Sequence, residues 1–262
     1  MDVLTFADGA LELVPDRIAR IVINAPARKN AISRRMWAAF PMLCDRIAQD
    51  DGIRVVLLTA AGGPGVFSAG ADISEFDEVY ANPEKTRAYN DAVRLAQARL
   101  QSLPRPMIAV INGACVGGGC GLVLAADLRF ASSEARFAIT PACLGLAYSP
   151  ADTAQLVEKI GPSRAKDMLF SGRFITATEA LSWGLIDRMI PADTLELEVL
   201  RYASDLAELS AVTHRSAKAI VNGLTPPPTN AALQAIYEAS FLSDDFREGQ
   251  RAFHERRKPF FE

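Results

Sequence analysis

The sequence lacks the residues that a structural metal site or a disulfide framework needs. Its 262 residues include four cysteines, at 44, 115, 120 and 143, and two histidines far from them, with no C-x-x-C pair. We therefore expect no metal site and four buried, free thiols in a reducing compartment. The N-terminal stretch MDVLTFADGALELV also lacks the basic start and apolar block of a signal peptide, which indicates a cytoplasmic protein.

Long runs of one charge sign are absent as well. The net charge is -3, and the 28 basic residues alternate with 31 acidic ones, so no basic stripe predicts a nucleic-acid partner. Residues 106–126 carry no charge and are about long enough to cross a bilayer. Asn112 and the clustered glycines of this stretch favour a buried strand followed by a buried helix, and no membrane partner is expected.

The residues that are present predict an α/β fold. Half of the sequence is hydrophobic, enough for one large domain or for one domain with an appendage. Apolar, β-branched runs start at Arg17, Arg54 and Met107, and a loop and helical periodicity follow each of them. The clearest helix is predicted over Pro83–Leu103, before Pro104, with an apolar face turned to a sheet.

The last quarter of the chain has a different pattern. After Pro191 the apolar positions keep helical spacing and strand signals disappear. The TPPPT segment from Thr225 divides this region, and Ser243 with two following aspartates fits the start of a last helix. We therefore divide the chain into a core over residues 1–193 and a helical region over residues 194–262.

A glycine cluster, Gly117–Gly119 and Gly121, lies between a short apolar run and a predicted helix. Clustered glycines at such a junction indicate that something approaches the main chain closely. A phosphate-binding loop would need Lys followed by Ser or Thr where Cys120, Gly121 and Leu122 stand. A dinucleotide site would need the G-x-G-x-x-G spacing and an acidic residue after a second strand. The remaining interpretation is that this junction offers backbone N–H groups to a small oxygen atom.

The stretch FSAGADISEF, from Phe67 to Phe76, has a similar character. The small residues around Gly70 leave the main chain accessible, and Asp72 suits a helix start. A tight turn with a capping aspartate is the alternative interpretation.

Together these stretches resemble the crotonase superfamily, also called the enoyl-CoA hydratase/isomerase family. The resemblance covers nearly the whole chain and also rests on NAPARKNAIS from Asn24, AADLRFAS from Ala125, ALSWGLIDRMIP from Ala180 and REGQRAFHERRKP from Arg247. It implies a ClpP-like spiral of ββα turns, with a C-terminal helical region that builds trimers or dimers of trimers. It also implies an acyl-CoA substrate, whose coenzyme A makes a separate cofactor unnecessary.

The resemblance also assigns roles to single residues. The N–H groups of Ala71 and Gly118 would hold the thioester oxygen and stabilise an enolate. Substrate-binding positions near them are Ser68, Ala69, Asp72, Ile73, Val116, Gly117, Pro141 and Leu144. Coenzyme A would lie near Arg28, Lys29, Phe253 and Arg256, although solvated surface charge is the alternative for the basic residues.

The two glutamates of the hydratases are missing. Their positions hold Gly121 and Pro141, so the acid and the base of hydration are absent. Loss of carbon dioxide from a malonyl-type thioester forms the enolate without a base, which predicts a lyase of the decarboxylase type. The segment FAITPACLGLAYSP from Phe137 resembles methylmalonyl-CoA decarboxylases, and its Tyr148 is the predicted catalytic side chain, with packing in a lid loop as the alternative. Those decarboxylases commonly have histidine at Ala71.

Two further functions stay open. A hydratase or isomerase would use a water, Glu75 or Asp152 in place of the missing glutamates, and a binding module would hold coenzyme A esters without turnover. Asp152 follows Ser149 and Pro150, so helix capping is the role we predict for it. Asp127 is predicted to pair with Arg129 or a neighbour.

Overall fold

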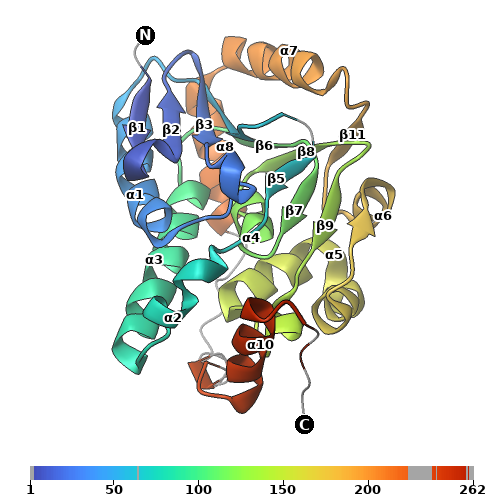
Figure 1. Cartoon of the computed structure of the whole chain (residues 1–262). Coiled ribbons are helices and arrows are strands. Elements are labelled where there is room, and N and C mark those ends of the chain that lie inside the picture. The colour runs from blue at the N-terminus through green and yellow to red at the C-terminus, as the bar shows by residue number, and fades with distance from the viewer. Residues whose placement is uncertain (1–2, 64, 224–237, 240, 258, 260–262) are drawn as a thin grey trace.

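The computed structural model describes residues 3–63, 65–223, 238–239, 241–257 and 259. Two sheets lie at its centre with helices around them (Figure 1). The strands are β1 (Leu4–Phe6), β2 (Leu11–Val14), β3 (Ile18–Ile23), β4 (Val55–Ala60), β5 (Val66–Ser68), β6 (Met107–Ile111), β7 (Ala114–Val116), β8 (Leu128–Ser132), β9 (Arg136–Ala138), β10 (Ile175–Thr176) and β11 (Arg188–Ile190). The α-helices are α1 (Arg34–Gln49), α2 (Phe76–Val79), α3 (Pro83–Gln101), α4 (Gly118–Leu124), α5 (Pro150–Ser171), α6 (Ala177–Trp183), α7 (Leu195–Glu208), α8 (Ala211–Gly223) and α10 (Asp244–His254). Short 3₁₀ turns are η1 (Ala7–Gly9), η2 (Pro26–Arg28), η3 (Ile73–Glu75) and η4 (Pro141–Leu144).

The larger sheet has the strand order β1-β2-β3-β4-β6-β8-β11, and the smaller sheet has the order β10-β9-β7-β5. In the larger sheet the neighbouring strands β3, β4, β6, β8 and β11 are parallel. In the smaller sheet β5, β7 and β9 are parallel to one another. A strand of the larger sheet is followed in the chain by a strand of the smaller sheet and then by a helix, as in β6, β7 and α4. β4, β5 and α3 repeat this order, and so do β8, β9 and α5. The predicted α/β fold with repeated ββα turns is therefore confirmed.

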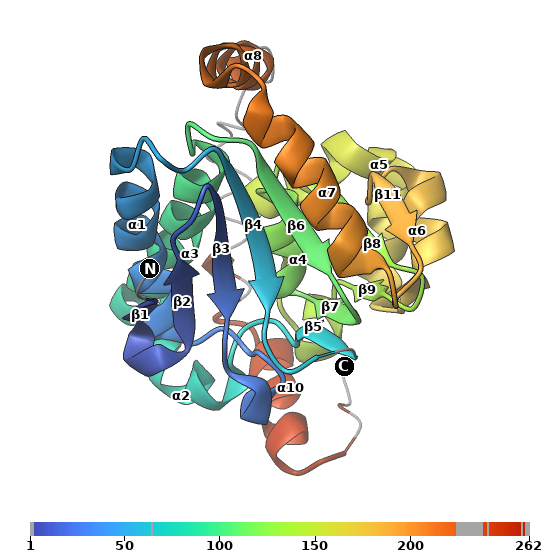
Figure 2. The same ribbon diagram turned by 90° about the horizontal axis from the view of Figure 1, so that it is seen from above.

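The three strands predicted from apolar runs are present as β3, β4 and β6. In β4 the run from Val55 to Leu58 is buried throughout, as expected for a parallel strand covered on both faces. One core cluster lies between the sheets and the helices α1, α3, α4 and α5. A second cluster joins the other face of the larger sheet to α7, which crosses β4, β6 and β8 (Figure 2).

The prediction for the helix at residues 83–103 is correct in extent and wrong in its partner. α3 ends at Gln101, two residues before Leu103, and Asn82 caps its start. Its apolar face packs mainly against α1 instead of a sheet. α1 already covers the start of the larger sheet, so α3 buries its apolar residues against that helix.

The described part of the C-terminal region consists of helices joined by turns and contains no strand. From residue 194 the described segments contain α7, α8 and α10, and Ser243 caps the last of these with its side chain accepting from the Phe246 amide. The proline segment at 225–229 lies outside the described residues. α7 packs on the larger sheet, and Lys218 of α8 forms an ion pair with Asp127 at 2.8 Å.

Two further sequence predictions have clear outcomes. Residues 106–126 form β6, β7 and α4, and no helix among the described residues is long and apolar enough to cross a membrane. All four cysteines are free thiols, but Cys143 is exposed, whereas the sequence analysis placed all four in the core. Cys143 lies in η4, a short turn in which no residue is buried.

Candidate functional site

Two backbone N–H groups from distant segments lie side by side. A side-chain carbon added to Gly118 would lie 3.3 Å from the Ala71 nitrogen, and one added to Gly70 would lie 3.3 Å from the Gly118 nitrogen. Within the part of the chain that the structure describes, neither amide donates to an acceptor. Both residues line one cavity. Paired, open donors of this kind are suited to one oxygen that carries negative charge.

The loop that carries Ala71 is held by the turn that follows β3. The Ala69 amide donates to the Lys29 carbonyl at 2.9 Å, and the Ile32 amide donates to the Gly70 carbonyl at 2.7 Å. The Asp72 amide returns a bond to the Ile32 carbonyl at 3.1 Å. These bonds use the groups on both sides of Ala71 and leave its own N–H for the cavity.

Glycine is required on both sides of this contact. Gly70 has a φ of +95°, and a side-chain carbon there would lie 2.8 Å from the Val116 carbonyl oxygen. Gly117, which precedes α4, has a φ of +49°. These backbone conformations are rare for other residues, so the glycines allow the two segments to meet. The first turn of α4 then points its N-terminus at the cavity, where its dipole favours negative charge.

Ser68 supports the loop from inside. It is completely buried, its hydroxyl donates to the Asn30 carbonyl at 2.8 Å, and it accepts from the Gly70 amide at 3.2 Å. A side chain at Gly119 would meet Ser68 at 2.9 Å. Ser68 therefore holds the position of the loop in this structure and does not line the cavity.

The cavity has a volume of about 120 Å³ and lies between these amides and several helices. It is lined by Trp37, Ala69, Gly70, Ala71, Ile73, Phe76, Tyr80, Tyr89, Asn90, Val93, Gly117, Gly118, Thr140, Pro141, Leu144, Leu146, Ala147, Tyr148, Ser149, Asp152 and Phe241. Aromatic rings form one wall, where Tyr80 stacks on Phe241 with ring centres 4.5 Å apart and meets Phe76 edge to face at 4.9 Å. Such a wall favours an apolar group.

The position of the first missing glutamate is filled by other side chains. A side-chain carbon on Gly121 would lie 2.4 Å from Gln97 Nε2, 2.9 Å from Asp152 Oδ1 and 3.4 Å from the Tyr148 hydroxyl oxygen. The Tyr148 hydroxyl donates to the Gly117 carbonyl at 3.2 Å, so it lies close to the start of α4. Three polar groups therefore surround the space that a glutamate would occupy.

Asp152 stands in the first turn of α5 behind the Ser149 cap, as predicted, but it also lines the cavity. Ser149 is the N-cap residue of α5. Its hydroxyl accepts a hydrogen bond from the Asp152 amide at 3.1 Å and donates one to Asp152 Oδ2 at 2.6 Å. Asp152 is 5% exposed, and burial raises its pKa from 3.8 to about 6, while Ser149 and Gln97 nearby lower it in part. A buried carboxyl with such a pKa in a cavity is typical of functional sites.

The other carboxylates have structural partners. Glu75 accepts from the Arg34 amide at 2.6 Å, and Asp72 accepts from Ser74 in η3. Asp127 does not pair with Arg129 but with Lys218, because Asp187 already bonds Arg129 at 2.8 Å. The second missing glutamate position, Pro141, begins η4 and offers no ionisable group.

The structure brings together part of the predicted site. Eight predicted residues line the cavity: Ala69, Ala71, Ile73, Gly117, Gly118, Pro141, Leu144 and Tyr148. Seven lie outside its lining: Arg28, Lys29, Ser68, Asp72, Val116, Phe253 and Arg256. Arg28 pairs with the buried Asp72 at 2.7 Å, and Lys29 is exposed beside the Ala71 loop. Phe253 and Arg256 are exposed at the end of α10. The binding roles of these seven residues stay predictions.

Sequence reasoning missed several cavity residues. Trp37 comes from α1, Tyr89 and Asn90 come from α3, and Phe241 precedes α10. Gln97 of α3 does not line the cavity, but its amide lies beside Gly121. Its side chain is 4% exposed, which is unusual for an amide, and no sequence pattern indicates this burial. The helical spacing of Tyr89 and Val93 is a signal of a buried face, but it does not say that the face meets a cavity.

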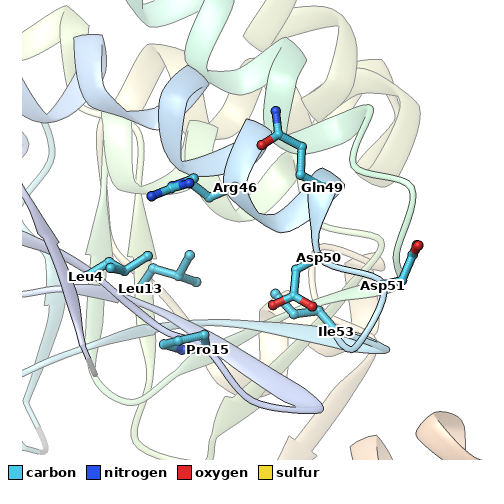
Figure 3. Close-up of a pocket in the computed structure, with 8 residues that line it drawn as sticks. All are labelled: Leu4, Leu13, Pro15, Arg46, Gln49, Asp50, Asp51 and Ile53. Carbon is cyan, nitrogen blue, oxygen red and sulfur yellow. The ribbon is translucent and has the colours of Figure 1, made fainter. Parts of the chain in front are cut away.

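A second pocket lies where β1 and β2 approach the end of α1 (Figure 3). Its lining combines Leu4, Leu13, Pro15 and Ile53 with the polar side chains of Arg46, Gln49, Asp50 and Asp51. None of the residues predicted from the sequence lines it, and it has no lining residue in common with the cavity at Ala71.

Comparisons with known proteins agree on one group. A sequence profile described as Enoyl-CoA hydratase/isomerase matches residues 14–262. The 2,3-dehydroadipyl-CoA hydratase of Escherichia coli is 30% identical over 248 residues, which cover 94% of this chain and 95% of that protein. A crystal structure of an enoyl-CoA hydratase/isomerase family protein from Hyphomonas neptunium is 38% identical, with a TM-score of 0.79 and 97% of each chain covered. A methylmalonyl-CoA decarboxylase in complex with 2-nitronate-propionyl-CoA is 27% identical, with a TM-score of 0.88 and coverage of 97% and 98%.

Proposed function

The chain belongs to the enoyl-CoA hydratase/isomerase family of the crotonase superfamily, and we propose that it is a lyase that removes carbon dioxide from a malonyl-type coenzyme A thioester. One observation carries this proposal. The Ala71 and Gly118 amides lie together and donate to no acceptor among the described residues, while glycine and proline stand where a hydratase has its two glutamates. The site is therefore equipped to stabilise an enolate and lacks the usual pair that moves protons.

Decarboxylation fits such a site. When the bond between the α-carbon and the carboxylate breaks, its electron pair moves into the thioester, and negative charge develops on the thioester oxygen. Two preorganised N–H donors at that oxygen typically contribute about 3 kcal/mol each to the transition state. No base is needed to form the enolate, because carbon dioxide leaves in place of a proton.

Tyr148 is the side chain that we propose to orient the carboxylate. Its hydroxyl lies near Gly121 and is bonded to the carbonyl of Gly117, next to the amide at Gly118. The likeness to methylmalonyl-CoA decarboxylase supports this role. A carboxylate held out of the plane of the thioester has the breaking bond aligned with the carbonyl π-system, which speeds the step.

We propose that coenzyme A lies along the turn after β3 and the end of α10. Arg28 and Lys29 are exposed next to the Ala71 loop, and Phe253 and Arg256 offer a ring and a cation from the C-terminal side. Ser68, Asp72 and Val116 support the binding loops, with Asp72 fixing Arg28 through their ion pair. Coenzyme A arrives as part of the substrate, and we propose no separate cofactor.

A hydratase or isomerase is the second candidate. The buried carboxyl of Asp152 favours it, because that group lines the same cavity and is suited to move a proton. The name of the Escherichia coli relative, 2,3-dehydroadipyl-CoA hydratase, also supports it. In this case the carboxylate of Asp152 would act as the base that the positions of Gly121 and Pro141 do not provide.

An assay of the purified protein separates the candidates. It is incubated with methylmalonyl-CoA and, in parallel, with crotonyl-CoA, and the products are identified by mass spectrometry. The proposal expects propionyl-CoA from the first thioester and little hydration of the second. Hydration of crotonyl-CoA at ordinary enzymatic rates without decarboxylation would overturn the proposal.

A Tyr148→Phe variant tests whether the protein is a catalyst or a binding module. We expect turnover of methylmalonyl-CoA to fall about 100-fold while the affinity for propionyl-CoA stays the same. A native protein that binds acyl-CoA but turns over neither thioester would instead be a binding module.

We also propose a trimer or a dimer of trimers in the cytoplasm. α8 carries exposed apolar side chains at Val212, Ile220 and Val221, which suit an interface between copies of the chain. Light scattering coupled to size exclusion measures the assembly, and a monomer at micromolar concentration would contradict this proposal.

A further inference from the structure

The strongest unassigned group in the cavity is the carboxyl of Asp152. Asp152 lies near the start of α5, but its Oδ1 atom is beside Gly121 of α4. Gly121 follows Gly118, whose amide faces the cavity, by one turn of that helix. Gly121 has no side chain, and this leaves room for the carboxyl. A larger residue at position 121 would collide with both Asp152 and Gln97.

Helix capping explains only half of this carboxyl. The bond between Ser149 and Asp152 uses Oδ2, at 2.6 Å. The other oxygen, Oδ1, is buried and accepts no well-aligned hydrogen bond from the described residues, although Gln97 is near enough to lower the pKa of the carboxyl. A buried polar atom without a partner is costly, so its retention next to the site of reaction points to a use.

The surroundings of Asp152 extend the pH range in which its carboxyl is neutral up to about pH 6. The polar groups that face it among the described residues are Ser149 and Tyr148 from its own segment and Gln97 from α3, and none of them is a cation. Burial therefore acts on the carboxyl without compensation by a positive charge. A neutral carboxyl does not repel an anionic substrate, and it carries the proton that an enolate needs.

We propose that Asp152 is the acid that protonates the α-carbon of the enolate, a role that rests on the proposed decarboxylation. After carbon dioxide has left, the electron pair of the enolate forms a new C–H bond with the proton of Asp152. The carboxylate that remains takes a proton from solvent before the next turnover. Gln97 is a positioning residue in this proposal, because its amide lies against the same space at Gly121 and limits where the carboxyl can move.

The test uses the reverse of this step. Propionyl-CoA is incubated with the protein in D₂O, and exchange of its α-protons for deuterium is followed by nuclear magnetic resonance. Exchange needs a group that removes and returns the α-proton, but it does not need decarboxylation. We expect the Asp152→Asn variant to exchange at least about 100-fold more slowly than the native protein, with propionyl-CoA affinity changed less than threefold.

Thr176→Ala provides the matched control. Thr176 caps α6 in a capping box with Glu179, away from the cavity, so this variant loses a helix cap without touching the site. We expect it to exchange at the native rate. An equal loss of exchange in both variants would mean that Asp152 acts through stability alone, and this would overturn the proposal.

The remaining outcomes separate the two proposals. Exchange that depends on Asp152, without release of carbon dioxide from methylmalonyl-CoA, would overturn the decarboxylase and leave the role of Asp152 intact. Decarboxylation together with undiminished exchange in Asp152→Asn would overturn the role of Asp152 alone. A native protein that does not exchange propionyl-CoA would also overturn it.

A second measurement applies if the Asn variant does not fold. The native exchange rate is then followed against pH, where Tyr148 is the other titratable group facing the carboxyl among the described residues. Removal of the α-proton needs the ionised carboxylate, so the rate is expected to rise tenfold per pH unit and to level off near neutral pH. A rate independent of pH between 4 and 7 would contradict the proposal.

Discussion

The first turn of α4 has two ends that are built in different ways. At its start, Gly118 and Ala71 contribute backbone N–H groups that lie side by side and are fixed by bonds between main-chain atoms. One turn later, at Gly121, the site is made of side chains: Gln97 from α3, Tyr148 from the loop after η4 and Asp152 from α5. The backbone end follows the family, and the side-chain end departs from it.

This difference shows where such a fold is free to change its chemistry. A donor made of main chain requires a particular loop conformation, so Gly70 and Gly117 cannot be replaced without strain. A proton-transferring group needs only a position in the same cavity. It can therefore come from another element once a smaller residue, here Gly121, leaves the space open.

The largest effect is expected when the family's glutamate is restored at the side-chain end. Gly121→Glu would drive a side chain into Gln97 and place a second carboxyl next to Asp152. Overpacking and an unpaired buried charge together are expected to lower the free energy of unfolding by about 4 kcal/mol, measured by urea titration.

Gln97→Ala combined with Gly121→Glu is the control for this effect. A side-chain carbon at position 121 would lie 2.4 Å from Gln97 Nε2. Removing the Gln97 amide is therefore expected to restore part of the lost stability, because it makes room for the new glutamate. Additive losses in the double variant would show that the departure from the family does not depend on packing at Gly121.

The next effect concerns the backbone end. In Gly70→Ala the new carbon would lie 2.8 Å from the Val116 carbonyl at a φ of +95°, and this would shift the adjacent Ala71 amide. We expect kcat/KM for the thioester that the native protein converts to fall by about 100- to 1,000-fold. Gly63→Ala is the control, because Gly63 has a φ of +75° with open space around it. Similar losses in both variants would indicate general backbone strain and not damage to the oxyanion site.

A third effect is the pH dependence that Asp152 gives to stability. Its pKa is about 6 in the folded protein and 3.8 at its ordinary value, so the folded state binds more protons between these limits. The contribution of Asp152 to the free energy of unfolding is therefore fully present below about pH 4. It is lost as the pH rises through about 6, and the total loss is roughly 3 kcal/mol. The difference between the native protein and Asp152→Asn in urea titrations isolates this contribution. A difference that does not change with pH would show that the carboxyl is not held in its neutral form.

The smallest effect is expected at Arg28, one of the residues that we propose to contact coenzyme A. Arg28 is more than half exposed, and its ion pair with Asp72 contributes little to stability. Arg28→Ala is expected to raise KM about fivefold, or about 1 kcal/mol, and to leave kcat unchanged. Arg35→Ala removes another exposed ion pair, with Asp8, and serves as the control. An equal rise of KM in both variants would argue against the proposed contact between Arg28 and coenzyme A.

The backbone end could be predicted from the sequence. Glycine and alanine in short ordered motifs indicate the loops, and the loops determine where Ala71 and Gly118 lie. The strands that position these loops were also evident, because β3, β4 and β6 consist mainly of apolar residues, with Arg20 as the one charged residue among them.

The side-chain end could not be predicted in the same way. The helix start at Ser149 was evident and assigned Asp152 to capping, but local spacing does not show that the second oxygen of the carboxyl faces a cavity. Gln97 lies 55 residues away along the chain and shows no pattern of its own. Long-range packing also decided the partner of Asp127, which is Lys218 of α8. These contacts depend on how elements far apart in sequence meet.

The approach of α10 to the cavity has a consequence for synthesis of the protein. Gly249 lies so close to η4 that a side-chain carbon there would be 2.4 Å from the Leu144 carbonyl oxygen, and Phe241 stacks on Tyr80. The wall of the cavity is therefore finished by residues that the ribosome adds well after both amide-bearing loops. A nascent chain that already has both amide-bearing loops still lacks Phe241, so its cavity stays open on the side of Tyr80.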